Sequence, residues 1–424
     1  MENYDIRLSE NEIPKKWLNA FVDLKVPIPE AKNSEFGNQL KDMENIRLKE
    51  LTKEEKSREK WMNIPEDILN EYIKAGRPTK LTRAVNLEKY IGCSSKIYLK
   101  REDLLPTHSF KLNTAIAQAY FAEKENIQEL VTETGAGQWG VSLAYACRKR
   151  DIKVKIFWAK ASKQQKELRR IMTELFGAEL FSSPCADSEV GRKIMEKNEY
   201  GTIGSGISEA IDYALHHENC RYVSGSVHKH VLIHQSIIGL ETQMQLKQAG
   251  VKPDVLVACV GGGSNLGGLM LPFIISDDYS NLKYQGAESM ASPRFTKGEY
   301  RYDHSDPLGL TPLTCSYTLG MDFVPSPVHT GGLRQHNSSP ILGALYRNSI
   351  LDIKAYQQEE IFQAGRVLAM QEGILPAPES CHGVKAAIDI AMAAEKEGRE
   401  KNIVVCLSGS GYYDLTGYKE VLNF

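Results

Sequence analysis

The sequence lacks several features that mark whole classes of protein. Its eight cysteines include no C-x-x-C pair, so neither a zinc site nor a disulfide framework is indicated. No apolar run approaches the length that spans a membrane, and the first residues show early acid and no apolar signal segment. Scattered thiols without a targeting signal are typical of a reducing compartment, so we expect a cytoplasmic protein.

The chain has no excess of charge of either sign. It carries 52 basic and 54 acidic side chains, a net charge of -2, which gives no electrostatic reason to expect nucleic acid or an anionic membrane as a partner. Hydrophobic residues at 42% and charged residues at 25% are ordinary for a globular protein. These values favour an enzyme that acts on small metabolites.

The length and the order of elements predict two lobes. A chain of 424 residues exceeds what one compact core usually holds. Residues 1–76 are rich in Lys, Glu, Asn and Pro and predict an extension that packs on the core. Beyond it, short β-rich runs alternate with amphipathic helices, which predicts an α/β fold of mostly parallel sheet covered by helices, with one lobe at 77–228 and a second at 229–424. The expected strands are 96–100, 129–132, 153–158, 254–260, 284–287 and 403–407, and the expected helices are 112–125, 138–150, 163–176, 231–248, 358–372 and 380–397.

Three successive glycines after a buried strand are the most informative motif. Gly261, Gly262, Gly263, Ser264 and Asn265 follow the apolar run 254–260 and begin a helix. Such a loop leaves backbone N–H groups pointing into one concavity, which suits a phosphate. A site for a nucleoside triphosphate would require a Lys and then a Ser or Thr directly after the glycines, and this sequence has no such pair there. The spacing of the glycines also does not match the dinucleotide-binding motif. A small phosphorylated cofactor remains.

Lys111 is the candidate nucleophile. It stands where a predicted helix begins, and the positive end of a helix dipole disfavours an ammonium, so a neutral amine able to form an imine is more accessible there. An imine-forming lysine beside a phosphate loop is what pyridoxal 5'-phosphate requires.

Two further strand ends carry polar residues. The turn after the strand 129–132 offers closely spaced N–H groups and a Thr hydroxyl, which suit the carboxylate of an amino acid. Glu133 begins this turn and can pass protons to a leaving hydroxyl, although it can instead only cap the turn. Ser408 follows the strand 403–407. A hydroxyl facing a pyridine nitrogen cannot hold it protonated, which favours elimination and replacement at Cβ over transamination.

Three histidines at the start of a predicted helix suggest a metal site at first sight. His230 and His234 are one helical turn apart, but no Glu follows His230 and no third carboxylate ligand is obvious. We therefore expect no metal at His228, His230 and His234.

Several separated motifs together resemble one known family. They are K-R-E-D, S-F-K-L-N-T-A, E-T-G-A-G-Q-W-G, G-G-G-S-N, E-G-I-L-P-A-P-E-S and L-S-G-S-G, in the order of the tryptophan synthase beta chain, a fold-type II pyridoxal-phosphate enzyme. The match runs almost end to end. The Trp of G-Q-W-G and the long N-terminal extension resemble the second, often stand-alone type of beta chain.

The resemblance implies a role for each motif residue. Lys111 would carry the Schiff base and Glu133 would act as acid and base. Asp322 would contact the substrate hydroxyl and favour closure. The cofactor would be held by Asn113 on its O3' side, by Glu379 near the ring, by Ser408 at the pyridine nitrogen and by the glycine loop at the phosphate. The substrate carboxylate would be bound by Thr134, Gly135, Ala136, Gln138 and Trp139.

The resemblance also implies a reaction and an assembly. L-Serine would lose water to give an aminoacrylate, which would add indole at Cβ to form L-tryptophan. Family members are usually homodimers. The sequence does not show whether an alpha chain docks, or whether backbone carbonyls hold a monovalent cation, because neither leaves a residue signature.

Some positions depart from the family pattern. Phe110 stands where the family usually has His before the lysine, Ser410 and then Tyr412 follow Ser408, and G-G-L-R continues with Gln335 instead of Tyr. These changes keep a different nucleophile or donor amino acid, or a serine or threonine deaminase, as alternatives. A non-catalytic homologue would need to lose Lys111 or Glu133, and both are present.

Overall fold

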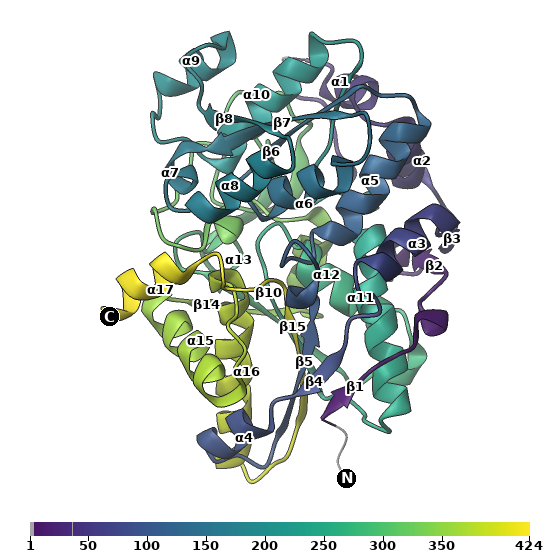
Figure 1. The fold of residues 1–424 in the computed structure, drawn as a ribbon, viewed down its shortest axis with the longest axis vertical. Coiled ribbons are helices and arrows are strands. Elements are labelled where there is room, and N and C mark those ends of the chain that lie inside the picture. The colour runs from purple at the N-terminus through teal and green to yellow at the C-terminus, as the bar shows by residue number, and fades with distance from the viewer. Residues whose placement is uncertain (1–3, 36) are drawn as a thin grey trace.

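The computed structural model describes residues 4–35 and 37–424 (Figure 1). The larger of its sheets has, among these residues, seven strands. From β5 onward they are parallel, whereas β1 and β4 are antiparallel additions at one edge. In spatial order the strands are β1 (Asp5–Ile6), β4 (Leu81–Arg83), β5 (Lys96–Arg101), β15 (Asn402–Leu407), β10 (Val255–Cys259), β11 (Lys283–Ser289) and β14 (Asp352–Tyr356).

Helices cover both faces of this sheet, which explains why its central strands are almost continuously apolar. α15 (Gln358–Glu372) and α16 (Pro378–Lys396) lie on one side, and α11 (Lys229–Gln248) and α12 (Ser264–Ile274) lie on the other (Figure 1). α11 and α12 pack very closely, because a Cβ atom added at Gly268 would lie 2.6 Å from the carbonyl oxygen of Gln235. Shorter helices on this lobe are α4 (Val85–Ile91), α13 (Arg294–Lys297), α14 (Pro340–Arg347) and α17 (Leu415–Leu422).

The smaller sheet lies in the upper part of Figure 1 and is parallel throughout. Its strands, in spatial order, are β8 (Glu179–Ser183), β7 (Lys153–Ala159), β6 (Glu129–Thr134) and β9 (Cys220–Tyr222). Around them lie α5 (Leu112–Lys124), α6 (Gln138–Cys147), α7 (Lys160–Lys163), α8 (Glu167–Leu175), α9 (Glu189–Met195) and α10 (Ile203–Leu215). Two antiparallel pairs, β2 (Lys16–Leu18) with β3 (Trp61–Asn63) and β12 (Glu299–Asp303) with β13 (Thr314–Thr318), stand apart.

The N-terminal segment packs against α11. It contains α1 (Gln39–Ile46), α2 (Lys49–Lys56) and α3 (Glu66–Lys74), and its Trp17 and Leu51 side chains are buried. Glu54 of α2 pairs with the buried His234 of α11 at 3.0 Å. Apolar burial and this pairing fix the segment on the core.

The α/β architecture predicted from the sequence is confirmed. The expected strand 96–100 is present, but as β5 it pairs with β15 in the larger sheet and not with β6. The division of the chain at residue 228 stays a prediction. The expected helix 163–176 is interrupted: α7 ends at Lys163 and α8 begins at Glu167. In between, the buried Lys166 ammonium donates to Asp414 Oδ1 at 2.5 Å and to the His329 carbonyl at 3.1 Å, which holds this stretch against the other lobe.

None of the helices formed by residues 4–35 and 37–424 is long and apolar enough to cross a membrane.

Candidate active site

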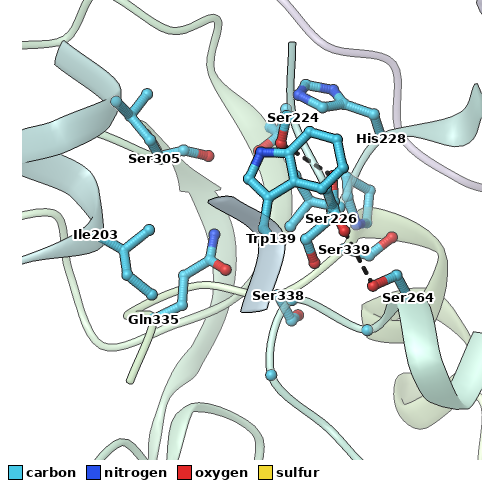
Figure 2. A pocket seen from close by; sticks show the side chains of 18 of the residues that line it. Trp139, Ile203, Ser224, Ser226, His228, Ser264, Ser305, Gln335, Ser338 and Ser339 are labelled. Carbon is cyan, nitrogen blue, oxygen red and sulfur yellow. Dashed lines mark hydrogen bonds between the residues drawn. The ribbon is translucent and has the colours of Figure 1, made fainter. Parts of the chain in front are cut away.

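A cavity of about 500 Å³ lies where strand ends of both sheets meet the starts of several helices (Figure 2). The lining includes fourteen of the sixteen residues proposed from the sequence, which come from the ends of β6, β10 and β15 and the starts of α5, α6, α12 and α16. They are Lys111, Glu133, Thr134, Gly135, Ala136, Gln138, Trp139, Gly261, Gly262, Gly263, Ser264, Asn265, Glu379 and Ser408. The remaining two, Asn113 and Asp322, do not line it.

The Lys111 amine faces the glycine loop. Lys111 occupies the N-cap position of α5, and its Nζ donates to Ser264 Oγ at 2.9 Å and to the carbonyl oxygen of Gly225. Burial lowers the pKa of Lys111 to about 7, although the nearby Cys259 and Glu133 act in the opposite direction. The amine is therefore neutral in a large fraction of molecules near neutral pH, as a nucleophile must be.

The glycine loop forms a cradle that side chains would fill. Gly263 has φ +110°, a left-handed conformation that favours glycine, and it caps α12, which begins at Ser264. A Cβ atom added at Gly262 would lie 2.2 Å from Ser226 Oγ and 2.9 Å from Gln335 Oε1. The missing side chains leave space in front of the first turn of α12, whose N–H groups have no helical partner.

Glu133 is buried in the wall of the cavity and is protonated more readily than an ordinary glutamate. Desolvation raises the pKa of its carboxyl to about 7, against the lowering effect of a 2.8 Å hydrogen bond that Tyr222 Oη donates to Oε2. A carboxyl with a pKa near the working pH can both give and take a proton. Tyr222 fixes its orientation.

The turn between β6 and α6 presents the start of a helix to the same space. Thr134 Oγ1 accepts a 3.4 Å hydrogen bond from Gly140 N, and Gln138 Nε2 donates to Glu379 Oε2 at 3.1 Å. Trp139 Nε1 donates to Thr132 Oγ1 at 2.7 Å, so the polar edge of the ring is occupied. The free N–H groups at this helix start suit a carboxylate.

Ser408 has neutral partners. Its Oγ lies 2.8 Å from Ser380 Oγ and 3.5 Å from Cys259 Sγ. Glu379 also lines the cavity, but its Oε1 accepts a 2.9 Å hydrogen bond from Gly332 N. A group that meets Ser408 would therefore contact a hydroxyl and not a carboxylate.

Asn113 lies in a buried charged network next to the cavity. Its Nδ2 donates to Glu102 Oε2 at 3.0 Å and to Gln235 Oε1 at 2.9 Å, and its Oδ1 accepts from Arg77 Nη1 at 2.8 Å. Arg77 and Glu102 are fully buried, so the amide is held by charged partners and does not reach the cavity. A contact between Asn113 and a cofactor would require this network to rearrange.

Asp322 lies on the surface. Its side chain is 73% exposed, and Oδ1 is 3.7 Å from Lys197 Nζ. Its predicted contact with the substrate stays a prediction and would require its segment to move toward the cavity.

Sequence reasoning missed part of the lining. Tyr222 ends β9, a three-residue strand without a motif, and Gly225 and Ser226 follow it. Cys259 ends the strand before the glycines, where it looks like an ordinary core residue. The N-terminal segment also contributes to the wall. Its lining residues are Phe21, Ile28, Pro29, Glu30, Ala31, Leu40, Met43, Arg47 and Glu55. These residues lie far from the motifs along the chain, and no sequence pattern links them to the site.

Two of the three histidines singled out from the sequence have side-chain partners in the protein. His230 Nδ1 lies 2.6 Å from Glu55 Oε1, and His234 lies between Thr114 and Glu54. Across the part of the chain that the structure describes, no group of three or more His, Cys, Asp or Glu is arranged to hold a metal ion.

Comparisons with known proteins show which family the chain belongs to. Residues 73–409 match the family model described as pyridoxal-phosphate dependent enzyme. The chain is 45% identical to tryptophan synthase beta chain 2 of Methanothermobacter thermautotrophicus, with 99% of this chain and 98% of that protein covered. It is 44% identical to tryptophan synthase beta chain 2 of Pyrococcus furiosus, with 98% and 94% covered.

Solved structures with the same fold are more distant in sequence. Threonine deaminase isoform 2 of Solanum lycopersicum superimposes with a TM-score of 0.62 at 18% identity over 95% of this chain and 94% of that one. An L-serine ammonia-lyase of Rhizomucor miehei gives 0.61 at 18% identity over 81% and 97%. At this identity the likeness concerns the fold alone. The sequence matches go further: the chain belongs to the pyridoxal-phosphate dependent enzymes and, among them, to the family of tryptophan synthase beta chains of the second type.

Proposed function

We propose that this protein is a lyase that joins L-serine and indole to give L-tryptophan and water. The observation that carries the proposal is that one cavity is lined at once by the Lys111 amine, the glycine loop, the turn at 134–139 and the Glu133 carboxyl. The relatives that match over nearly the whole chain are named tryptophan synthase beta chain, which supports the same reaction.

The cavity fits pyridoxal phosphate. The cradle at Gly262, which a Cβ atom would fill, faces the start of α12, and the neutral form of Lys111 is accessible next to it. The cofactor would be held by Lys111, the glycine loop and Ser408, and when bound it supplies an electron sink for the substrate's Cα. Because Ser408 is a neutral partner, the arrangement favours loss and replacement of a group at Cβ.

The protein's own residues would orient the substrate and move protons. The N–H groups of the turn at 134–138 would bind the carboxylate of L-serine. Glu133, buried and with its pKa raised to about 7, would give a proton to the departing Cβ hydroxyl and afterwards take one from the incoming nucleophile. Lys111 would take and return the Cα proton.

An apolar region of the cavity suits indole. Ile28, Met43, Ile203, Ile207 and Pro312 all line the cavity, and the first two belong to the N-terminal segment. Apolar walls favour a flat aromatic nucleophile and disfavour water, which would otherwise compete for the same site. This lining supports synthesis over deamination.

Product analysis tests the proposal. With L-serine and indole, the purified protein loaded with cofactor should form L-tryptophan, detected by chromatography and mass spectrometry. Omission of indole is the control for deamination, which would give pyruvate and ammonia. Pyruvate as the main product in the presence of indole, with no tryptophan, would contradict the assignment.

The attachment of the cofactor should depend on pH around neutrality. The neutral amine is the nucleophile, and burial lowers the pKa of Lys111 to about 7, so attachment to the apo-protein should speed up as pH rises and reach half its maximum near pH 7. Stopped-flow absorbance measures this rate. Glu133→Gln is the control, because Glu133 titrates in the same range and the half-maximum should survive its removal. A rate that keeps rising up to pH 10 would show an ordinary lysine.

We also propose a cytoplasmic homodimer. This rests on the resemblance to the beta chains, and it leaves docking of an alpha chain open. Light scattering of the holoprotein, with and without an alpha chain, measures both associations.

A further inference from the structure

Two neighbouring serines of the cavity wall have buried hydroxyls that form no hydrogen bond with any residue that the structure describes. Ser338 and Ser339 are each 1% exposed, and neither Oγ has a hydrogen-bond partner among residues 4–35 and 37–424. Ser339 is the N-cap residue of α14, yet its hydroxyl does not cap the helix, which is the usual role of a serine at that position. Buried hydroxyls without partners are costly, and where they line a cavity, as these two do, a ligand in that cavity can complete them.

The two serines stand next to the glycine loop. Ser339 N donates to the carbonyl oxygen of Gly262 at 3.0 Å, and a Cβ atom added at Gly263 would lie 3.4 Å from Ser339 Cβ. Both serines line the cavity, and Figure 2 shows them there together with Ser226 and Ser264. The hydroxyls therefore share one space with the N–H groups of the loop.

This space favours an anion. The N-termini of α12 and α14 both border it, since Ser264, Pro340 and Ile341 line the same cavity. The fully buried Arg294 stands behind it and donates to the carbonyl oxygen of Val260 at 2.8 Å and to that of Leu333 at 3.0 Å. Arg294 thus ties the segment with the glycines to the segment that leads to the serines and adds a positive charge near both.

We propose that Ser338 and Ser339, together with the glycine loop beside them, donate hydrogen bonds to the phosphate of the cofactor. This inference rests on the proposed role of that loop.

Affinity for the cofactor with and without its phosphate tests the inference. The dissociation constants of pyridoxal phosphate and of pyridoxal are measured by absorbance titration of the apo-protein. Ser338→Ala and Ser339→Ala should each raise the dissociation constant of pyridoxal phosphate about 10-fold, and the double variant about 100-fold. Hydrogen bonds to a charged group are among the stronger ones. Pyridoxal binding should stay unchanged.

Ser316→Ala is the matched control. Ser316 is equally buried and its hydroxyl also has no partner among the described residues, but it lies outside the cavity lining, so both affinities should stay at the wild-type value. The inference is overturned if the double variant binds pyridoxal phosphate like Ser316→Ala, or if it loses affinity equally for both compounds.

Gly262→Ala separates this inference from the role of the loop. The Cβ atom added at this position would collide with Ser226 Oγ, so this variant should bind pyridoxal phosphate more weakly. If it does so while the serine variants do not, the serine inference alone fails. If Gly262→Ala leaves the affinity unchanged, the assignment of the loop fails, whatever the serines do.

Discussion

Lys111→Ala is expected to abolish covalent attachment of pyridoxal phosphate and to lower turnover by at least about 10³-fold. The Lys111 amine is the group that faces both the glycine loop and Glu133 in the cavity, and its loss removes the nucleophile and the base together. Absorbance of the bound cofactor and the rate of tryptophan formation measure the two effects. Reduction of the wild-type protein with borohydride, followed by peptide mass spectrometry, should find the cofactor on residue 111.

Lys163→Ala is the matched control. Lys163 is a half-buried lysine of the same lobe whose pKa is also lowered by desolvation, but it does not line the cavity. This variant should keep the absorbance and the turnover of the wild type. Cofactor found on another lysine after reduction, or an unchanged spectrum in Lys111→Ala, would refute the assignment.

Glu133→Gln is expected to lower kcat about 10²- to 10⁴-fold while the cofactor still attaches to Lys111. Glutamine keeps the size of the side chain and can still meet Tyr222 Oη, but it cannot carry a proton to the departing hydroxyl. The pKa of Glu133, raised to about 7 by burial, should appear in the pH profile of wild-type kcat/KM and be absent from that of the variant. Steady-state kinetics from pH 5 to 9 measure this.

Glu209→Gln serves as its control. Burial also raises the pKa of Glu209, but this carboxyl lies outside the cavity lining and accepts from Cys185 N at 2.8 Å and Ser188 Oγ at 2.9 Å. Its replacement should leave kcat and the pH profile unchanged. An equal loss in both variants would indicate that Glu133 only supports the local structure.

The strand ends were predictable because their residues carry local signals. Gly261, Glu133 and Ser408 follow short apolar runs, and parallel strands bring their carboxyl ends to one edge, so their convergence follows from the fold class. Helix limits set by local propensity were also close: the expected helix 358–372 coincides with α15.

Long-range contacts were not predictable from the same signals. The pairing of β5 with β15 joins segments about 300 positions apart, and no local pattern specifies it. Likewise, the motif that contains Asn113 gives no sign of Arg77 or of the network that holds its amide. The break before α8 depends on Asp414, which lies in the other lobe. In each case a contact with a residue far away in the sequence determines the local structure, and the neighbouring residues alone do not specify it.

The lining of the cavity begins at Phe21 and ends at Ser408. On the ribosome, a growing chain therefore exposes the glycine loop and Lys111 well before β15 emerges to pair with β5 and bring Ser408 to the cavity wall. A nascent chain can bury its smaller sheet early, but it has no finished binding site until translation is almost complete. A chain that stops before β15 therefore lacks one wall of the cavity, and with it part of the stabilisation that a bound ligand gives to a folded protein.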